Sequence, residues 1–201
     1  MMPVREALAF GRKQLIKKEA INSLFETKLL IKDILNISDE DLLPTSEVFL
    51  SEAQFETFQS FLERRKKSEP IAYILNKREF WKDSFYVNKF TLIPRPDSEI
   101  IIEMVLNLIP NKDKKLKFCD LGTGSGCLII SLLKEYKYSE GVGIDNSKEA
   151  IKVAEKNKNI LSNNGRLIFQ LADFSTFRTT EFDMIVCNPP YVNKNDINNM
   201  Q

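Results

Sequence analysis

The chain has no histidine among its 201 residues. Histidine is the usual general base near neutral pH and the commonest metal ligand, so its absence predicts chemistry that uses neither, and no metal site. The three cysteines, Cys119, Cys127 and Cys187, stand in apolar segments. We expect reduced core thiols, not a disulfide framework or a zinc site. No apolar run is long enough to cross a bilayer, and there is no signal peptide, so we expect a cytoplasmic protein with no membrane partner.

An excess of charge of either sign is also missing. The 29 Lys and Arg residues nearly balance the 28 Asp and Glu residues, which leaves a net charge of +1. This balance argues against a large nucleic-acid footprint, and we expect no direct nucleic-acid binding. The hydrophobic share of 43% is typical of a globular protein. The length admits one domain of ordinary size and a smaller one.

The N-terminal third of the chain has helical periodicity. Apolar residues recur at helical spacing between residues 4 and 67, and Ser51 with Gln54 predicts a capping box at the start of the last helix. That helix ends in the basic run 64–67, which we interpret as a solvated helix end and not as a nucleic-acid patch. Residues 1–69 are therefore predicted to form a small helical bundle.

The rest of the chain predicts strands and an α/β fold. Residues 70–96 are rich in β-branched and aromatic side chains and predict a β-hairpin linker, with its turn at 82–84. From residue 117 onward strands and helices alternate, which is typical of a doubly wound, mostly parallel, Rossmann-like sheet, and the domain that contains them is predicted at 97–201. The expected elements are strands at 117–121, 141–145, 167–171 and 183–187, and helices at 125–136 and 147–159.

A glycine-rich turn follows the first of these strands. Gly122, Gly124 and Gly126 allow a ligand to approach the backbone closely, although a dinucleotide site has the same pattern. Asp120 precedes the turn, where it would repel a pyrophosphate but accept from an amino group. Asp145 ends the next strand about 20 residues later, where a carboxylate accepts from ribose hydroxyls. S-adenosylmethionine, which has a ribose and an ammonium but no phosphate, fits these charges.

The run Asn188-Pro189-Pro190-Tyr191 follows the last apolar strand. Asn188 offers a carbonyl acceptor, the prolines fix the local backbone so that carbonyls can be aimed, and Tyr191 supplies a stacking face. This chemistry suits a flat group that bears an NH2, such as an amide or an exocyclic base amine. A plain strand-ending turn is the alternative for this run by itself. The glycine turn upstream favours the functional interpretation.

Five short stretches follow the helical region in a fixed order. They are Glu69-Pro70-Ile71-Ala72-Tyr73-Ile74, Glu79-Phe80-Trp81, Leu92-Ile93-Pro94-Arg95-Pro96-Asp97-Ser98-Glu99, Asp120-Leu121-Gly122-Thr123-Gly124-Ser125-Gly126 and Asn188-Pro189-Pro190-Tyr191. In this combination the chain resembles the release-factor glutamine N5-methyltransferases (the HemK/PrmC family) over essentially its whole length. The resemblance implies a class I methyltransferase sheet at 97–201 that binds S-adenosylmethionine, and a substrate-docking bundle at 1–69.

The resemblance also implies roles for individual residues. The turn would hold the methionine part of the cofactor through Gly122, Thr123, Gly124, Ser125 and Gly126. Asp145 would bind the ribose hydroxyls, and Phe174 would lie beside the adenine. The substrate glutamine, from the Gly-Gly-Gln loop of a peptide chain release factor, would be held by Asn188, Pro189, Pro190 and Tyr191. Asn188, Pro189 and Tyr191 are the predicted catalytic residues, and Asn188 would also contact the cofactor.

The chain departs from the family where it ends. Members of the family continue beyond the Asn-Pro-Pro-Tyr run, whereas this chain ends at Gln201. We therefore expect an incomplete sheet with an open flank. Three interpretations stay open: a protein-glutamine methyltransferase, a DNA or RNA amino-methyltransferase with the same turn, and a non-catalytic truncated remnant. The near-neutral charge and the helical region favour the first over the second.

Overall fold

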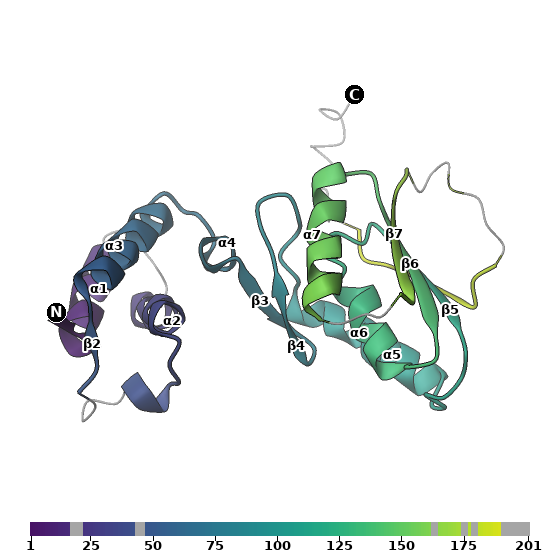
Figure 1. Ribbon diagram of the computed structural model, residues 1–201, viewed down its shortest axis with the longest axis horizontal. Coiled ribbons are helices and arrows are strands. Elements are labelled where there is room, and N and C mark those ends of the chain that lie inside the picture. The colour runs from purple at the N-terminus through teal and green to yellow at the C-terminus, as the bar shows by residue number, and fades with distance from the viewer. Residues whose placement is uncertain (17–21, 43–46, 162–164, 174–176, 178–180, 190–201) are drawn as a thin grey trace. The chain divides into compact units, whose positions relative to one another are not determined.

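The computed structural model describes residues 1–16, 22–42, 47–161, 165–173, 177 and 181–189. The chain divides into two units, Met1–Asn76 and Lys77–Gln201 (Figure 1). No helix within the described ranges is long and apolar enough to cross a membrane.

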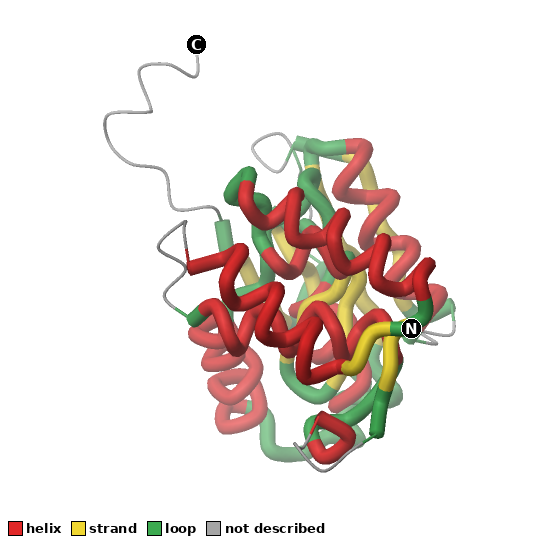
Figure 2. Tube along the Cα trace, turned by 90° about the vertical axis from the view of Figure 1, so that its left-hand side faces the viewer, coloured by secondary structure: helices red, strands yellow, loops and turns green. Residues whose placement is uncertain are grey.

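The first unit consists mainly of helices that each bury one apolar face. Its elements are β1 (Met2–Pro3), α1 (Val4–Ile16), α2 (Ser23–Leu35), a 3-10 turn (Glu40–Leu42), β2 (Phe49–Leu50), α3 (Glu52–Lys66) and α4 (Ile71–Leu75). The short strands β1 and β2 pair antiparallel beside the N-terminus (Figure 2). The helices share one core, which includes Val4, Ala7, Leu15, Leu30, Ile31, Phe58, Leu62 and Ile74. The predicted N-terminal helical bundle is confirmed.

Polar contacts define both ends of α3. Ser51 Oγ accepts from the backbone N–H of Gln54 at 3.2 Å, and Gln54 Oε1 accepts from the backbone N–H of Ser51 at 2.8 Å. The predicted capping box is therefore confirmed. At the other end of α3, Arg65 donates two hydrogen bonds to the Glu26 carboxylate of α2, at 2.8 and 2.9 Å. The basic helix end is thus not merely solvated, because Arg65 fastens α3 to α2.

Residues 71–75 form a helix in the first unit, whereas the composition of residues 70–96 predicted a β-hairpin linker. Arg64, near the end of α3, pairs with the Glu69 carboxylate at 2.6 and 2.8 Å and donates to the Ile74 carbonyl at 3.2 Å. The second contact satisfies a carbonyl that the end of α4 would otherwise leave unpaired. The hairpin itself falls in the second unit, and the three-part division of the chain stays a prediction.

The hairpin comprises β3 (Lys77–Phe80) and β4 (Asp83–Tyr86), which pair antiparallel. Its existence is confirmed, but the turn is Trp81-Lys82, so the predicted turn at 82–84 is wrong at its last two positions. Trp81 has a φ of 56°, a conformation that bulky residues seldom adopt. The tight reversal therefore occurs without a glycine to mark it in the sequence.

The remainder of the second unit alternates helix and strand. Its elements are a 3-10 turn (Pro96–Ser98), α5 (Glu99–Leu108), β5 (Lys117–Leu121), α6 (Cys127–Glu135), β6 (Glu140–Asp145), α7 (Lys148–Ile160), β7 (Leu167–Leu171) and β8 (Met184–Cys187). The four strands of the sheet are parallel and lie in the order β7-β6-β5-β8. The α/β fold class is confirmed, and each predicted strand and helix of this region agrees to within two residues at either end.

Helices α6 and α7 cover the same face of the sheet. Each connects a strand to the next parallel strand in one direction across the sheet, and right-handed crossovers place both on one side. Helix α5 contacts α6, and α6 contacts α7, so the three helices lie together on that face (Figure 1). Phe118 and Phe169 belong to the core beneath them. Ile168 and Ile185 lie on the opposite face and are 55% and 54% exposed.

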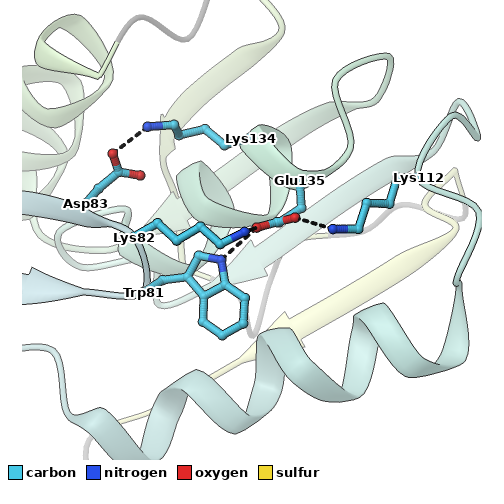
Figure 3. A network of polar contacts seen from close by, with 6 residues as sticks. All are labelled: Trp81, Lys82, Asp83, Lys112, Lys134 and Glu135. Carbon is cyan, nitrogen blue, oxygen red and sulfur yellow. Dashed lines mark hydrogen bonds and ion pairs between the residues drawn. The ribbon is translucent and has the colours of Figure 1, made fainter.

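Glu135, the last residue of α6, fastens the hairpin turn to the helical layer (Figure 3). Its side chain is 8% exposed and accepts from Trp81 Nε1 at 2.9 Å and from Lys112 Nζ at 2.5 Å, and it also pairs with Lys82. Burial alone would raise the pKa of Glu135, but these hydrogen bonds lower it to about 2. The turn is therefore held by a carboxylate that stays ionised.

Candidate functional site

The ends of three strands bring the main candidate residues together. The register pairs Leu121 of β5 with Ile144 of β6 on one side and with Cys187 of β8 on the other. The residues that follow these three meet at the carboxyl edge of the sheet: Gly122, Asp145 and Asn188. The strand order reverses between β5 and β8, and open α/β sheets bind ligands at such a point. The glycine turn and the Asn-Pro-Pro-Tyr run therefore begin at the same edge, as predicted.

The glycine turn has an open side and a packed side. Its glycines have positive φ values of 73°, 55° and 79° at Gly122, Gly124 and Gly126. The backbone N–H groups of Gly122 and Thr123 donate to the Ile144 carbonyl at 2.9 and 2.8 Å, which holds the turn against β6. A Cβ at Gly122 would meet no atom within 4 Å, so space is open beside it, whereas a Cβ at Gly126 would lie 2.9 Å from Phe169.

Asp120 is a buried carboxyl directly beneath this turn, with 1% of its surface exposed. One of its oxygens accepts from Thr123 Oγ1 at 2.7 Å, and the other, Oδ1, has no hydrogen-bond partner among the described residues. Burial raises the pKa of Asp120 to about 7 against the opposing hydrogen bond from Thr123, and the charge of Asp145 adds to the rise. The Thr123 hydroxyl, predicted to touch the cofactor, is therefore engaged with Asp120.

Asp145 sets the shape of the edge as well as its charge. One carboxylate oxygen accepts from the backbone N–H of Gly124 and the other from that of Ser147, each at 2.9 Å. Ser147 in turn caps α7, since its hydroxyl accepts from the backbone N–H of Ala150 at 3.2 Å. A carboxylate oxygen accepts more than one hydrogen bond, so Asp145 retains capacity for the hydroxyls of a ribose.

Asn157 of α7 supports the turn and is absent from the sequence-based prediction. It is fully buried, and it exchanges two hydrogen bonds with the Tyr86 backbone, at 2.7 and 2.9 Å. Its Nδ2 also donates to the Ser125 carbonyl at 2.8 Å, so it links the hairpin to the glycine turn. An asparagine at helical spacing with the apolar Val153 and Ala154 was the available signal, because a buried amide needs partners.

The side chain of Asn188 reaches a second sequence motif. Asn188 Nδ2 donates to Ser98 Oγ at 2.7 Å, across a separation of 90 residues. Ser98 lies at the junction between the 3-10 turn and α5, within the stretch Leu92–Glu99. No periodicity or local motif predicts this contact. It engages the donor end of the Asn188 amide.

Some predicted site residues lie outside the described ranges, namely Phe174, Pro190 and Tyr191. Pro189 is described and exposed, next to Asn188 at the edge of the sheet. The roles assigned to these four residues stay predictions.

The three thiols differ in their surroundings. Cys119 is buried and Cys127 is half-buried, and burial raises their pKa values to about 11 and about 12. Cys187 is exposed at the end of β8, so the prediction of a core thiol is wrong for this residue. All three are free thiols, and their raised pKa values disfavour the reactive thiolate.

Comparison with known proteins agrees with both units. A family model described as the PrmC N-terminal domain matches residues 6–75, and one described as the methyltransferase small domain matches residues 99–200. The release factor glutamine methyltransferase of Buchnera aphidicola subsp. Schizaphis graminum is 35% identical over 191 residues, which cover 94% of this chain and 68% of that protein. That of Coxiella burnetii is 34% identical over 196 residues, which cover 98% and 70%. This chain belongs to the release factor glutamine methyltransferase family.

The share of a relative's own length that this chain covers differs from one relative to another. A bifunctional methyltransferase of Rickettsia typhi is 39% identical over 189 residues, which cover 85% of this chain but 36% of that protein. The chain thus spans between 36% and 70% of the length of the curated relatives named above. The family resemblance inferred from the five sequence stretches is confirmed.

Proposed function

We propose that this chain transfers a methyl group from S-adenosylmethionine to the side-chain amide nitrogen of the glutamine in the Gly-Gly-Gln motif of peptide chain release factors. The observation that carries the proposal is the placement of Asn188 beside Gly122 at the reversal of the strand order. Asn188, the proposed amide-binding group, would then act next to a turn suited to a cofactor. The names of the relatives support the same substrate.

The described part of the site fits S-adenosylmethionine. The open space beside Gly122 admits ligand atoms close to the backbone. Asp145 has acceptor capacity for ribose hydroxyls at the edge of the sheet, whereas the unpartnered oxygen of Asp120 is buried beneath the turn. When bound, the cofactor supplies an electrophilic methyl group on a positively charged sulfur. Phe174, predicted beside the adenine, completes the proposed cofactor contacts.

The residues of the Asn-Pro-Pro-Tyr run would position a poor nucleophile. The lone pair of an amide nitrogen is delocalised into its carbonyl, so the nitrogen must be oriented rather than merely bound. The Asn188 side-chain carbonyl and the Pro189 backbone carbonyl would accept its two N–H bonds and favour the positive charge that develops on it. Pro190 and Tyr191 would sandwich the amide plane. This scheme needs no general base before transfer and is therefore compatible with a chain that has no histidine.

The first unit would dock the release factor. It matches the PrmC N-terminal domain as a whole, and it has its own hydrophobic core. A separately folded unit can bind the body of a protein substrate while the sheet edge receives one side chain. Removal of residues 1–76 is then expected to weaken release-factor binding, and S-adenosylmethionine binding should be retained.

The test is transfer of labelled methyl groups to a purified release factor. Asn188→Ala is expected to lower the rate on the order of 100-fold, as does the loss of one oriented polar group in other enzymes. Asn107→Ala is the matched control, since Asn107 is an exposed residue of α5. A wild-type rate for Asn188→Ala would contradict the proposal.

A further inference from the structure

We propose that Ser98 is a positioning residue that holds the side-chain amide of Asn188 ready for the substrate. The inference rests on the proposed function for its kinetic consequences, but the contact between the two residues is independent of it. Asn188 Nδ2 donates to Ser98 Oγ at 2.7 Å, which is at the short end of the range for N–H···O hydrogen bonds. Ser98 is 9% exposed, so water competes little for this bond.

The segment that carries Ser98 is itself fastened at both ends. Arg78 of β3 donates to the Pro94 carbonyl at 3.2 Å, and the backbone N–H of Trp81 donates to the Glu99 carboxylate at 2.8 Å. The backbone N–H of Ser98 donates to the Arg95 carbonyl at 3.0 Å and closes the 3-10 turn. The hydroxyl of Ser98 is therefore presented from a segment whose position the hairpin fixes.

The hydrogen bond to Ser98, here called the anchor, matters because the two ends of a carboxamide differ in chemistry. An asparagine side chain has a donor end and an acceptor end. With one N–H of Nδ2 donated to Ser98, Oδ1 has no hydrogen-bond partner among the described residues and would serve as the acceptor for an N–H of the substrate. If the amide rotated so that Nδ2 faced the substrate, two donors would oppose each other. The arrangement therefore suits a substrate that offers N–H groups, such as an amide or an amine.

A matched pair of substitutions isolates the hydroxyl. Threonine and valine have nearly the same shape, so Ser98→Thr retains the anchor and Ser98→Val removes it. In methyl transfer to a release factor, Ser98→Val is expected to lower kcat roughly 10-fold, with a smaller change in KM, because a misplaced group costs rate more than binding. Ser98→Thr is expected to retain most of kcat.

A double-mutant cycle tests whether Ser98 acts through Asn188. In an Asn188→Ala background, Ser98→Val should change kcat by less than about twofold, since the group that it positions is gone. A purely structural role for Ser98 predicts the same loss in both backgrounds. Equal losses, or equal rates for Ser98→Thr and Ser98→Val, would overturn the inference.

A second readout needs no substrate. The side-chain amide resonances of Asn188 in a ¹⁵N-labelled sample of the full chain are identified by their loss in Asn188→Ala. Ser98→Val is expected to shift them, and Ser98→Thr is expected to leave them near their wild-type positions. Unshifted resonances in Ser98→Val would overturn the inference. Failure of the wild-type chain to methylate a release factor, with the resonances shifted as expected, would instead refute the proposed function and leave the anchor standing.

Discussion

The backbone N–H of Gly124 donates to the Asp145 carboxylate at 2.9 Å, across 21 residues of sequence. The acid at the end of β6 thus holds the middle of the glycine turn at the end of β5. Its other oxygen accepts from the backbone N–H of Ser147 at the start of α7. Asp145 therefore has two roles in this account, since it shapes the turn and it is also proposed to bind the ribose.

Loss of the Asp145 carboxylate should weaken cofactor binding more than loss of a ribose contact alone. Asp145→Ala removes the acceptor of two backbone N–H groups, and hydrogen bonds to charged groups contribute about 1.5–3 kcal/mol each. We expect affinity for S-adenosylmethionine to fall on the order of 100-fold in calorimetric titration, with Asp145→Asn intermediate because it retains one acceptor. The control is Asp113→Ala, which removes an exposed carboxylate from the connection between α5 and β5. An unchanged Kd for Asp145→Ala would contradict these roles.

Two glycines of the turn should respond differently to alanine. Gly122 and Gly126 both have positive φ, so alanine strains either position by about 1–2 kcal/mol. At Gly126 the new Cβ would also lie 2.9 Å from Phe169, whereas at Gly122 it would enter open space. We expect Gly126→Ala to lower the free energy of unfolding in urea more than Gly122→Ala does. Gly122→Ala should instead lose more affinity for S-adenosylmethionine than its small loss of stability would explain. The reverse ranking would show that the open space is not the ligand side.

The buried carboxyl of Asp120 should make stability depend on pH. Burial raises its pKa from 3.8 to about 7. A carboxyl with a raised pKa in the folded state contributes stability that is complete below pH 3.8 and is lost as the pH rises through about 7. Asp120→Asn keeps an acceptor for Thr123 and does not ionise. Its free energy of unfolding relative to wild type should therefore increase by a few kcal/mol between pH 4 and pH 8, at about 1.4 kcal/mol per unit of pKa shift. If the difference in free energy of unfolding between Asp120→Asn and wild type did not change with pH, the raised pKa of Asp120 would be contradicted.

Sequence pattern predicted most of the second unit because its signals are local. Strands β5 and β7 occupy the predicted residues, since short apolar runs bounded by polar turns specify buried parallel strands. The hairpin turn was misplaced because Trp81 adopts a positive φ that is normally left to glycine or asparagine. Helix α4 was missed because a five-residue helix is too short for its periodicity to be seen.

Contacts between distant residues were beyond the sequence. The Asn188–Ser98 and Asn157–Ser125 bonds join elements that only the register of the sheet brings together. One amino-acid sequence contains no periodic pattern that predicts such pairs. Arg65 likewise looked like a helix-end charge until the position of Glu26 on α2 was known. The candidate residues of the site could be named from the sequence, but the residues that hold them in place could not.

Neutralising Glu135 should destabilise the chain in a manner that depends on pH. Its pKa, lowered to about 2, means that its ionised form contributes stability above pH 4.5, and that this contribution is lost as the pH falls through about 2. Glu135→Gln weakens the contacts to Trp81, Lys82 and Lys112, and we expect a loss of about 1–3 kcal/mol at pH 7 in urea unfolding. The difference in free energy of unfolding between Glu135→Gln and wild type should become smaller as the pH falls from 4.5 to 3. Glu103→Gln, at an exposed position of α5, is the control. A free-energy difference that becomes larger as the pH falls would contradict this account of the contacts of Glu135.

The most direct measurement is methyl transfer from labelled S-adenosylmethionine to three targets incubated separately with the full chain. The targets are a release factor, the same factor with its Gly-Gly-Gln glutamine changed to alanine, and bulk RNA and DNA. The account predicts label in the first target alone. Label in the nucleic acids, or label in the release factor that survives removal of the glutamine, would contradict it.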